Sequence, residues 1–190
     1  MRGEEPTAAT ENQASAPRSS LVSRHSRTLQ VRVWRGQDQG RLQTFEVPRL
    51  ESQTVLDVVT HIQRSLDPTL AYRFACRVGM CGSCAMTVNG RARWTCRTHV
   101  SAVTAGDALE IRPLSNLPVI KDLVTDMTPF FDKWTRAGGH FKGSTTRRDD
   151  FARVPPTGHE RRLADAAIEC IGCGVCYSSC DVVAWNADYL

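Results

Sequence analysis

Apolar and polar residues alternate in the first patterned stretch of the chain, which predicts a β-hairpin. Leu29, Val31 and Val33 alternate with polar residues, the pattern of a half-buried strand. The segment Gly36–Gly40 supplies a turn, and Arg41–Val47 reads as a second strand. We therefore expect two antiparallel strands at the start of the patterned region.

A helix is predicted after this hairpin. Thr54 and Asp57 have the spacing of a capping box at a helix start. Apolar residues then recur at helical spacing, at Val55, Leu56, Val58, Val59, Ile62 and Leu66. The pair Asp67-Pro68 predicts the end of the helix, because the residue before a proline disfavours the helical conformation.

Short strands are predicted again in the middle of the chain. The Asn89-Gly90 pair predicts a tight hairpin turn between Ala85–Val88 and Arg93–Thr95. Ala108–Arg112 gives a last strand. Two strands, a helix, a loop and further strands fit a β-grasp domain, so the fold class is predicted to be α+β.

A second helical pattern follows a linker at Pro113–Pro118. Val119–Met127 carries one apolar face at helical spacing and is predicted to be a helix, which Pro129 kinks or restarts. The apolar face continues through Phe130, Phe131 and Trp134. We interpret these aromatic residues as ordinary core.

Composition and hydrophobic pattern divide the chain into four regions. Residues 1–27 have no hydrophobic period and are expected to be a disordered tail. The arginines of this tail would suit a mitochondrial presequence, but its glutamates argue against one. A β-grasp domain is expected over 28–115, and a helix and linker over 116–159. The start of a helical domain is expected over 160–190, opening with a short helix at Arg161–Glu169.

The cysteine content of the chain indicates its function more clearly than its net charge does. A net charge of +4 over 190 residues is too small to indicate a nucleic-acid partner. No apolar run is long enough to span a bilayer. All eight cysteines fall in two groups, at 76–96 and 170–180, which favours metal binding and a reducing compartment.

The first cysteine group has the spacing of a plant-type [2Fe–2S] site. Its members follow C-x4-C-x2-C, with a fourth cysteine beyond a predicted strand, at Cys76, Cys81, Cys84 and Cys96. Gly79 and Gly82 lie between these cysteines, where a loop that turns its N–H groups toward sulfur needs conformational freedom. A structural zinc site is the alternative, but zinc ligands usually come as two short pairs. A disulfide framework is less favoured still, because no secretory signal precedes the motif.

The second cysteine group has the spacing of a bacterial ferredoxin. Its run is C-x2-C-x2-C-x3-C, at Cys170, Cys173, Cys176 and Cys180. In two-cluster ferredoxins the fourth cysteine of this run binds the other cluster, so the chain is short of thiolates. Either all four cysteines bind one cluster or the chain is incomplete at its C-terminal end, and we expect the second. Asp181 replaces the usual proline, and its charge is expected to lower the cluster's potential.

Together these motifs resemble the iron–sulfur subunit of succinate dehydrogenase/fumarate reductase. The resemblance covers about residues 28–190 and is carried by CRVGMCGSCAMTVNG, PLSNLPVIKDLVTDM, ECIGCGVCYSSC and AWNADYL. It implies three clusters in series, [2Fe–2S], [4Fe–4S] and [3Fe–4S]. It also implies an FAD-containing flavoprotein partner on one side, and membrane-anchor subunits with quinone on the other.

The resemblance assigns the cysteines to these clusters. It implies that Cys76, Cys81, Cys84 and Cys96 bind [2Fe–2S], that Cys170, Cys173 and Cys176 bind [4Fe–4S], and that Cys180 binds [3Fe–4S]. The last two clusters would be incompletely ligated by this chain. Asp181-Val182 stand where the family has a Pro-Ser pair, and Trp185 is a candidate quinone contact.

The implied function is an electron relay between the flavoprotein, which acts on succinate or fumarate, and membrane quinone. The sequence holds no Ser-His-Asp or paired-carboxylate set, so we expect no independent catalytic site. The expected location is peripheral, on the cytoplasmic face of a bacterial inner membrane or the matrix side of the mitochondrial one. An electron-transfer subunit of another flavin-linked dehydrogenase and a zinc-stabilised interaction protein remain alternatives.

Arginines gather around the first cysteine group, at Arg73, Arg77, Arg91, Arg93 and Arg97. They would offset the charge of a cluster or dock an acidic partner surface. A solvated basic face is an equally good interpretation.

Overall fold

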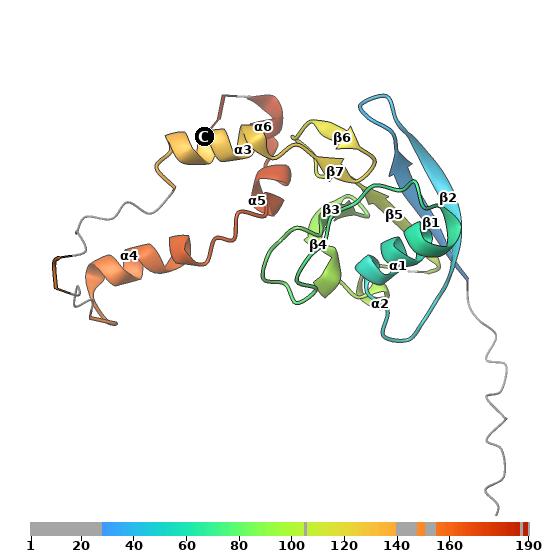
Figure 1. The fold of residues 1–190 in the computed structure, drawn as a ribbon, viewed down its shortest axis with the longest axis horizontal. Helices are drawn as coiled ribbons and strands as arrows, with labels where there is room; N and C mark the ends of the chain where they lie inside the picture. The colour runs from blue at the N-terminus through green and yellow to red at the C-terminus, as the bar shows by residue number, and fades with distance from the viewer. Residues whose placement is uncertain (1–27, 105, 140–147, 151–154, 187, 190) are drawn as a thin grey trace, which may run out of the picture.

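The computed structural model describes residues 28–104, 106–139, 148–150, 155–186 and 188–189. A sheet domain holds the first cysteine group, and a set of helices holds the second (Figure 1). The predicted tail at 1–27 lies outside the described residues, as does much of the predicted linker. In the described part of the chain, no helix is both long and apolar enough to cross a membrane.

The sheet has five strands in the order β2-β1-β5-β3-β4. Their bounds are β1 Thr28–Arg35, β2 Arg41–Pro48, β3 Ala85–Val88, β4 Arg91–Trp94 and β5 Ala108–Arg112. Strands β1 and β2 form the predicted antiparallel hairpin, and β5 pairs parallel to β1. This mixed sheet, with one helix on its face, is the predicted α+β arrangement (Figure 1).

The predicted helix packs against this sheet as α1, Val55–His61, and continues as a π-helical turn at Ile62–Leu66. Its capping box is present, because the Thr54 side chain accepts from the Asp57 backbone and the Asp57 carboxylate accepts from the Thr54 backbone. The helix ends at Asp67, as predicted. Its apolar face joins the strands in one core that includes Leu29, Val31, Val33, Val55, Val58, Val59, Leu109 and Ile111.

The second hairpin also forms where the Asn-Gly pair predicts it. Asn89 and Gly90 have positive φ angles of 46° and 78°, as the tight turn requires. Strand β4 begins two residues earlier than predicted and ends at Trp94. The next residues form a 3-10 turn, Thr95–Arg97, and the short helix α2, Val100–Val103.

The prediction of a helix over Val119–Met127 is wrong. This segment is a small hairpin of β6, Val119–Lys121, and β7, Val124–Thr125. Its turn residue Asp122 has a φ of 52° and is only 1% exposed. Tertiary contacts explain the difference, because the Asp122 carboxylate accepts hydrogen bonds from three distant groups, the backbone N–H of Gly36 and Ala71 and the side chain of Arg35.

Pro129 begins a new helix rather than kinking an old one. Helix α3 spans Thr128–Arg136, with the proline in its first turn, where a missing N–H costs little. Phe130 is buried, as predicted, but Phe131 is 43% exposed and is not ordinary core. Phe130 packs edge-on against Tyr177 and joins a second core with Ala85, Leu114, Leu117 and Val183.

Three helices carry or flank the second cysteine group. They are α4 His159–Ile168, α5 Val175–Ser178 and α6 Asp181–Trp185. The predicted helix at Arg161–Glu169 is therefore confirmed, with its bounds shifted slightly. Helix α4 extends away from the sheet domain, whereas α5 and α6 lie beside α3 (Figure 1). The second core joins these helices to the end of the sheet domain, since Ala85 of β3 belongs to it.

Candidate metal centre

The strand register of the second hairpin brings two distant cysteines together. Cys84 directly precedes β3 and Cys96 lies in the turn after β4, and the pairing of Ala85 with Trp94 aligns these ends. Both the backbone N–H and the hydroxyl of Thr95 donate to the Cys84 carbonyl, at 3.3 and 2.8 Å. The two cysteines are buried together with Leu56 of α1.

The other two cysteines of the first group lie in the loop before β3. The sulfur of Cys76 accepts backbone hydrogen bonds from Val78, Met80 and Cys81, at 3.4, 3.3 and 3.4 Å. The loop closes around the sulfur because Arg77 and Gly79 both have positive φ angles, 59° and 78°. Three N–H groups directed at one sulfur are suited to a negatively charged thiolate.

The thiols of the first cysteine group differ in how readily they ionise. Hydrogen bonds from Ser83, whose hydroxyl lies 3.3 Å from the sulfur, and from Cys76 lower the pKa of Cys81 to about 6. Burial raises the pKa of Cys96 to about 11, and the hydrogen bond and charge of Cys84 add to the rise. A bound cation would reverse the second effect, because positive charge stabilises crowded thiolates.

The first group is therefore arranged as two pairs, Cys76 with Cys81 and Cys84 with Cys96. In the part of the chain that the structure describes, no three His, Cys, Asp or Glu side chains converge as ligands of a single metal ion. A binuclear [2Fe–2S] cluster takes two ligands at each iron. The paired thiols, the buried floor and the inward N–H groups fit such a cluster.

The second group lies on a looser segment. Residues Cys170–Gly174 are irregular, with positive φ angles at Gly172 and Gly174 of 64° and 72°. Cys176 follows on α5, and Cys180 is the N-cap of α6. Cys173 and Cys180 are partly buried, while Cys170 and Cys176 are exposed.

Asn116 anchors the second group, and sequence reasoning missed it. Its side-chain amide donates to the carbonyls of Tyr177, Ser178 and Cys180, at 3.2, 3.4 and 3.2 Å. Its φ of 64° turns the linker toward α5 and α6. The only sequence signal was an Asn within a linker, and Asn tolerates this conformation better than most residues.

The two cysteine groups meet at one cavity. A cavity of about 230 Å³ lies between the sheet domain and the helices, and Cys81 and Cys173 both line it. Another side of this cavity is lined by three residues of the β7–α3 region, Thr125, Met127 and Phe131. The chain thus brings together two motifs that are separated by more than seventy residues in the sequence.

Comparison with known proteins identifies the first domain. Residues 28–132 match the family described as "2Fe-2S iron-sulfur cluster binding domain". The chain belongs to this family. Its match covers the sheet, the first cysteine group and most of the β6–β7–α3 region.

Curated relatives of this chain are named as iron–sulfur subunits. The chain is 36% identical over 155 residues to a fumarate reductase iron-sulfur subunit of Mycobacterium tuberculosis, covering 78% of this chain and 60% of that protein. It is 38% identical over 134 residues to a mitochondrial succinate dehydrogenase [ubiquinone] iron-sulfur subunit of Oryza sativa, covering 70% and 47%. The chain thus spans about half to three fifths of these relatives.

A solved structure supports the same fold. The "Mycobacterium smegmatis Sdh1 complex in the apo form" contains a chain that matches with a TM-score of 0.74 and 29% identity. The match covers 86% of this chain and 67% of that one. The iron–sulfur fold predicted from the sequence is therefore confirmed beyond the [2Fe–2S] domain alone.

Two of the arginines around the first loop of this [2Fe–2S] domain make contacts within it. Arg77 pairs with Asp57 at 2.8 Å and lies over the ring of Phe74. Arg73 donates to the Thr125 carbonyl at 3.1 Å. The Asp57 contact joins the start of α1 to the cysteine loop, and both arginines also remain exposed to solvent.

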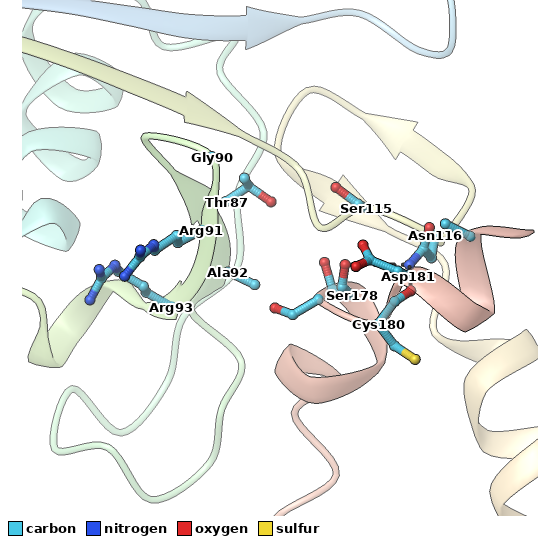
Figure 2. Close-up of a pocket in the computed structure, with 12 residues that line it drawn as sticks. Thr87, Gly90, Arg91, Ala92, Arg93, Ser115, Asn116, Ser178, Cys180 and Asp181 are labelled. Carbon is cyan, nitrogen blue, oxygen red and sulfur yellow. Dashed lines mark hydrogen bonds between the residues drawn. The ribbon is translucent and has the colours of Figure 1, made fainter.

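A larger groove also lies between the sheet domain and the helices. It has a volume of about 650 Å³ and separates the β3–β4 hairpin from α5 and α6 (Figure 2). Arg91 and Arg93 belong to its rim, but their side chains extend away from the helices. Asp181 lies inside the groove beside Asn116, one residue after the N-cap cysteine of α6. Trp185 lies at the end of α6 and is 84% exposed.

Proposed function

We propose that this chain is the electron-transfer component of a succinate dehydrogenase or fumarate reductase complex. The named relatives and the matching solved complex support this proposal. In this role it would connect an FAD-containing flavoprotein to membrane quinone. Iron–sulfur clusters supply one-electron redox chemistry when bound.

The observation that carries the proposal is the shared cavity lined by Cys81 and Cys173. An electron relay needs successive redox sites held close together, and this chain joins its two cysteine motifs directly. A protein that used its cysteines only for stability would have no need to bring the two groups together. The relay interpretation explains the contact, and the zinc-stabilised alternative does not.

The proposed ligands follow the two motifs. The [2Fe–2S] cluster would be held by Cys76, Cys81, Cys84 and Cys96, the [4Fe–4S] cluster by Cys170, Cys173 and Cys176, and the [3Fe–4S] cluster by Cys180. The protein's own contribution is electrostatic. Backbone N–H groups and Ser83 stabilise negative sulfur, while Leu56 and the sheet exclude water from the inner pair.

The proposed partners are a flavoprotein subunit and membrane-anchor subunits with quinone. The chain would sit peripherally on the membrane, on the bacterial cytoplasmic face or the mitochondrial matrix side. Its exposed Trp185 is the proposed quinone contact. The substrate chemistry would belong to the flavoprotein, so the chain alone would relay electrons without acting on succinate.

Co-purification with the flavoprotein tests this function. The purified complex is treated with succinate, and the clusters are followed by their visible and EPR spectra. We expect succinate to reduce them, with fumarate reoxidising them. Clusters that respond to the substrate of another flavin-linked dehydrogenase, and not to succinate, would contradict the proposal. A colourless chain that contains zinc would contradict the electron-transfer role altogether.

A further inference from the structure

The backbone of Gly82 lies in direct contact with the second cysteine group. A Cβ atom placed on Gly82 would lie 2.3 Å from Cβ and 3.0 Å from Cα of Cys173. It would also lie 3.3 Å from the side chain of Ile171. Real Cβ atoms do not approach other atoms this closely. The Cβ and Cα of Cys173 are fixed by the main chain, so no side-chain rotation can move them aside. Any side chain at position 82 would force the two segments apart.

Gly79, in the same loop, provides a contrast. Both glycines have positive φ angles, 78° for Gly79 and 67° for Gly82, so both suit the loop's conformation. A Cβ on Gly79, however, would meet only the side chain of Arg97, at 2.9 Å. That long side chain can move. The loop's conformation accounts for both glycines, and Gly82 has a second reason to lack a side chain, its contact with Cys173.

The segment that contacts Gly82 is held in place from its other side. A Cβ on Gly172 would meet the ring of Phe131 at 3.2 Å, and a Cβ on Gly174 would meet Met127 at 2.9 Å. Both partners belong to the region where β7 leads into α3. The segment around Cys173 is thus packed between the first cysteine loop and α3, and its separation from the loop is set by contact on both faces.

We propose that Gly82 is a positioning residue that sets the separation between the two redox groups. This inference rests on the proposed electron relay. Gly82 follows Cys81 directly, so one peptide unit and the contact between Gly82 and Cys173 connect the two groups. The absence of a side chain at position 82 keeps this connection short. A bulkier residue would lengthen it and weaken electronic and magnetic coupling between the groups.

The test compares substitutions at the two glycines in the full chain within its complex. The variants are Gly82→Ala and Gly82→Asn, with Gly79→Ala and Gly79→Asn as controls. Asn tolerates positive φ better than most residues. Comparing the Ala and Asn variants at each glycine therefore separates the effect of backbone strain from the loss of the contact between Gly82 and Cys173. Two properties are measured: the microwave power that half-saturates the EPR signal of the reduced [2Fe–2S] cluster, and hydrogen exchange of the amides at 171–176.

We expect the amides at 171–176 to exchange hydrogen faster in both Gly82 variants than in the wild type. The EPR signal of the [2Fe–2S] cluster should also saturate at lower microwave power, because a neighbouring paramagnetic cluster relaxes this signal less when it is farther away. The Gly79 variants strain the same cysteine loop, so their [2Fe–2S] signal serves as the reference for that strain. They should keep wild-type exchange at 171–176, because Gly79 does not contact that segment. Wild-type values in the Gly82 variants, or equal changes in both pairs, would overturn the proposal. The exchange comparison is made whatever the iron content, so loss of iron does not remove the test. A wild-type chain with no second cluster would instead count against the proposed relay.

Discussion

At the scale of single residues, the hydroxyl of Ser83 is the clearest tuning group of the first loop. It donates to the sulfur of Cys81 at 3.3 Å. A hydrogen bond to a ligand sulfur stabilises the reduced, more negative cluster and so raises its potential. We expect Ser83→Ala to lower the [2Fe–2S] midpoint potential by an amount on the order of tens of millivolts.

An EPR-monitored redox titration measures this shift. The exposed Ser101 on α2 supplies a matched control, because Ser101→Ala removes a hydroxyl outside the cysteine loop. A Ser83→Ala potential equal to that of wild type would show that this hydrogen bond does not tune the site.

Asp181 is the corresponding residue at the second group. It directly follows Cys180, and its carboxylate disfavours an added electron nearby. We expect Asp181→Asn to raise the midpoint potential of the cluster at this group, while the [2Fe–2S] potential stays at its wild-type value. Asp38→Asn, in the distant β1–β2 turn, is the control for a general loss of charge. An unchanged potential in redox titration would reject the effect.

At the scale of elements, the β6–β7 hairpin shows where sequence periodicity misleads. Leu123 enters the main core, but Ile120, which shares its predicted helical face, is exposed. The buried carboxylate of Asp122 decides the conformation through contacts with Arg35, Gly36 and Ala71. None of these partners is near it in the sequence. A pattern of apolar residues contains no information about such long-range hydrogen bonds.

The hairpin supports the site, because Ala71 leads directly into the first cysteine loop. Asp122→Asn replaces one accepting oxygen by an N–H donor in a buried position, yet Asn tolerates the positive φ. We expect it to lower the free energy of unfolding by roughly 1–3 kcal/mol in urea denaturation. Asp107→Asn, which breaks an exposed pair with Arg49, should cost less than about 1 kcal/mol. Equal losses in the two variants would show that Asp122 acts only as a surface charge.

Local signals, by contrast, predicted other elements well. The capping box at Thr54 and Asp57 and the turn at Asn89-Gly90 each depend on residues within a few positions of one another. Each formed as predicted, because such motifs satisfy their own backbone groups without help from the rest of the fold. Three cysteines of the first group, Cys76, Cys81 and Cys84, are also close together in the sequence, so their motif is local in the same sense. Only the β3–β4 register brings Cys96 to Cys84.

At the scale of the whole molecule, the arrangement of the two cysteine groups could not be predicted from the sequence. The motifs indicated what each group binds, but nothing in them specified that Gly82 would touch Cys173. That contact depends on the second core, where Phe130 of α3 packs on Tyr177 of α5. Asn116 fixes the same helices through three carbonyls. The relay proposal therefore depends on tertiary packing that follows from the complete fold.

We propose that the two cysteine groups hold separate iron–sulfur clusters in one chain. The most direct test is stepwise reduction of the wild type and of Cys84→Ser, followed by EPR with iron and sulfide analysis. We expect the substitution to alter or abolish the [2Fe–2S] signal, because Cys84 is one of the two buried thiols proposed to hold this cluster. The signal and iron of the second group should persist. A [2Fe–2S] signal unchanged by Cys84→Ser, or a wild-type chain that binds zinc in place of iron and sulfide, would contradict the account.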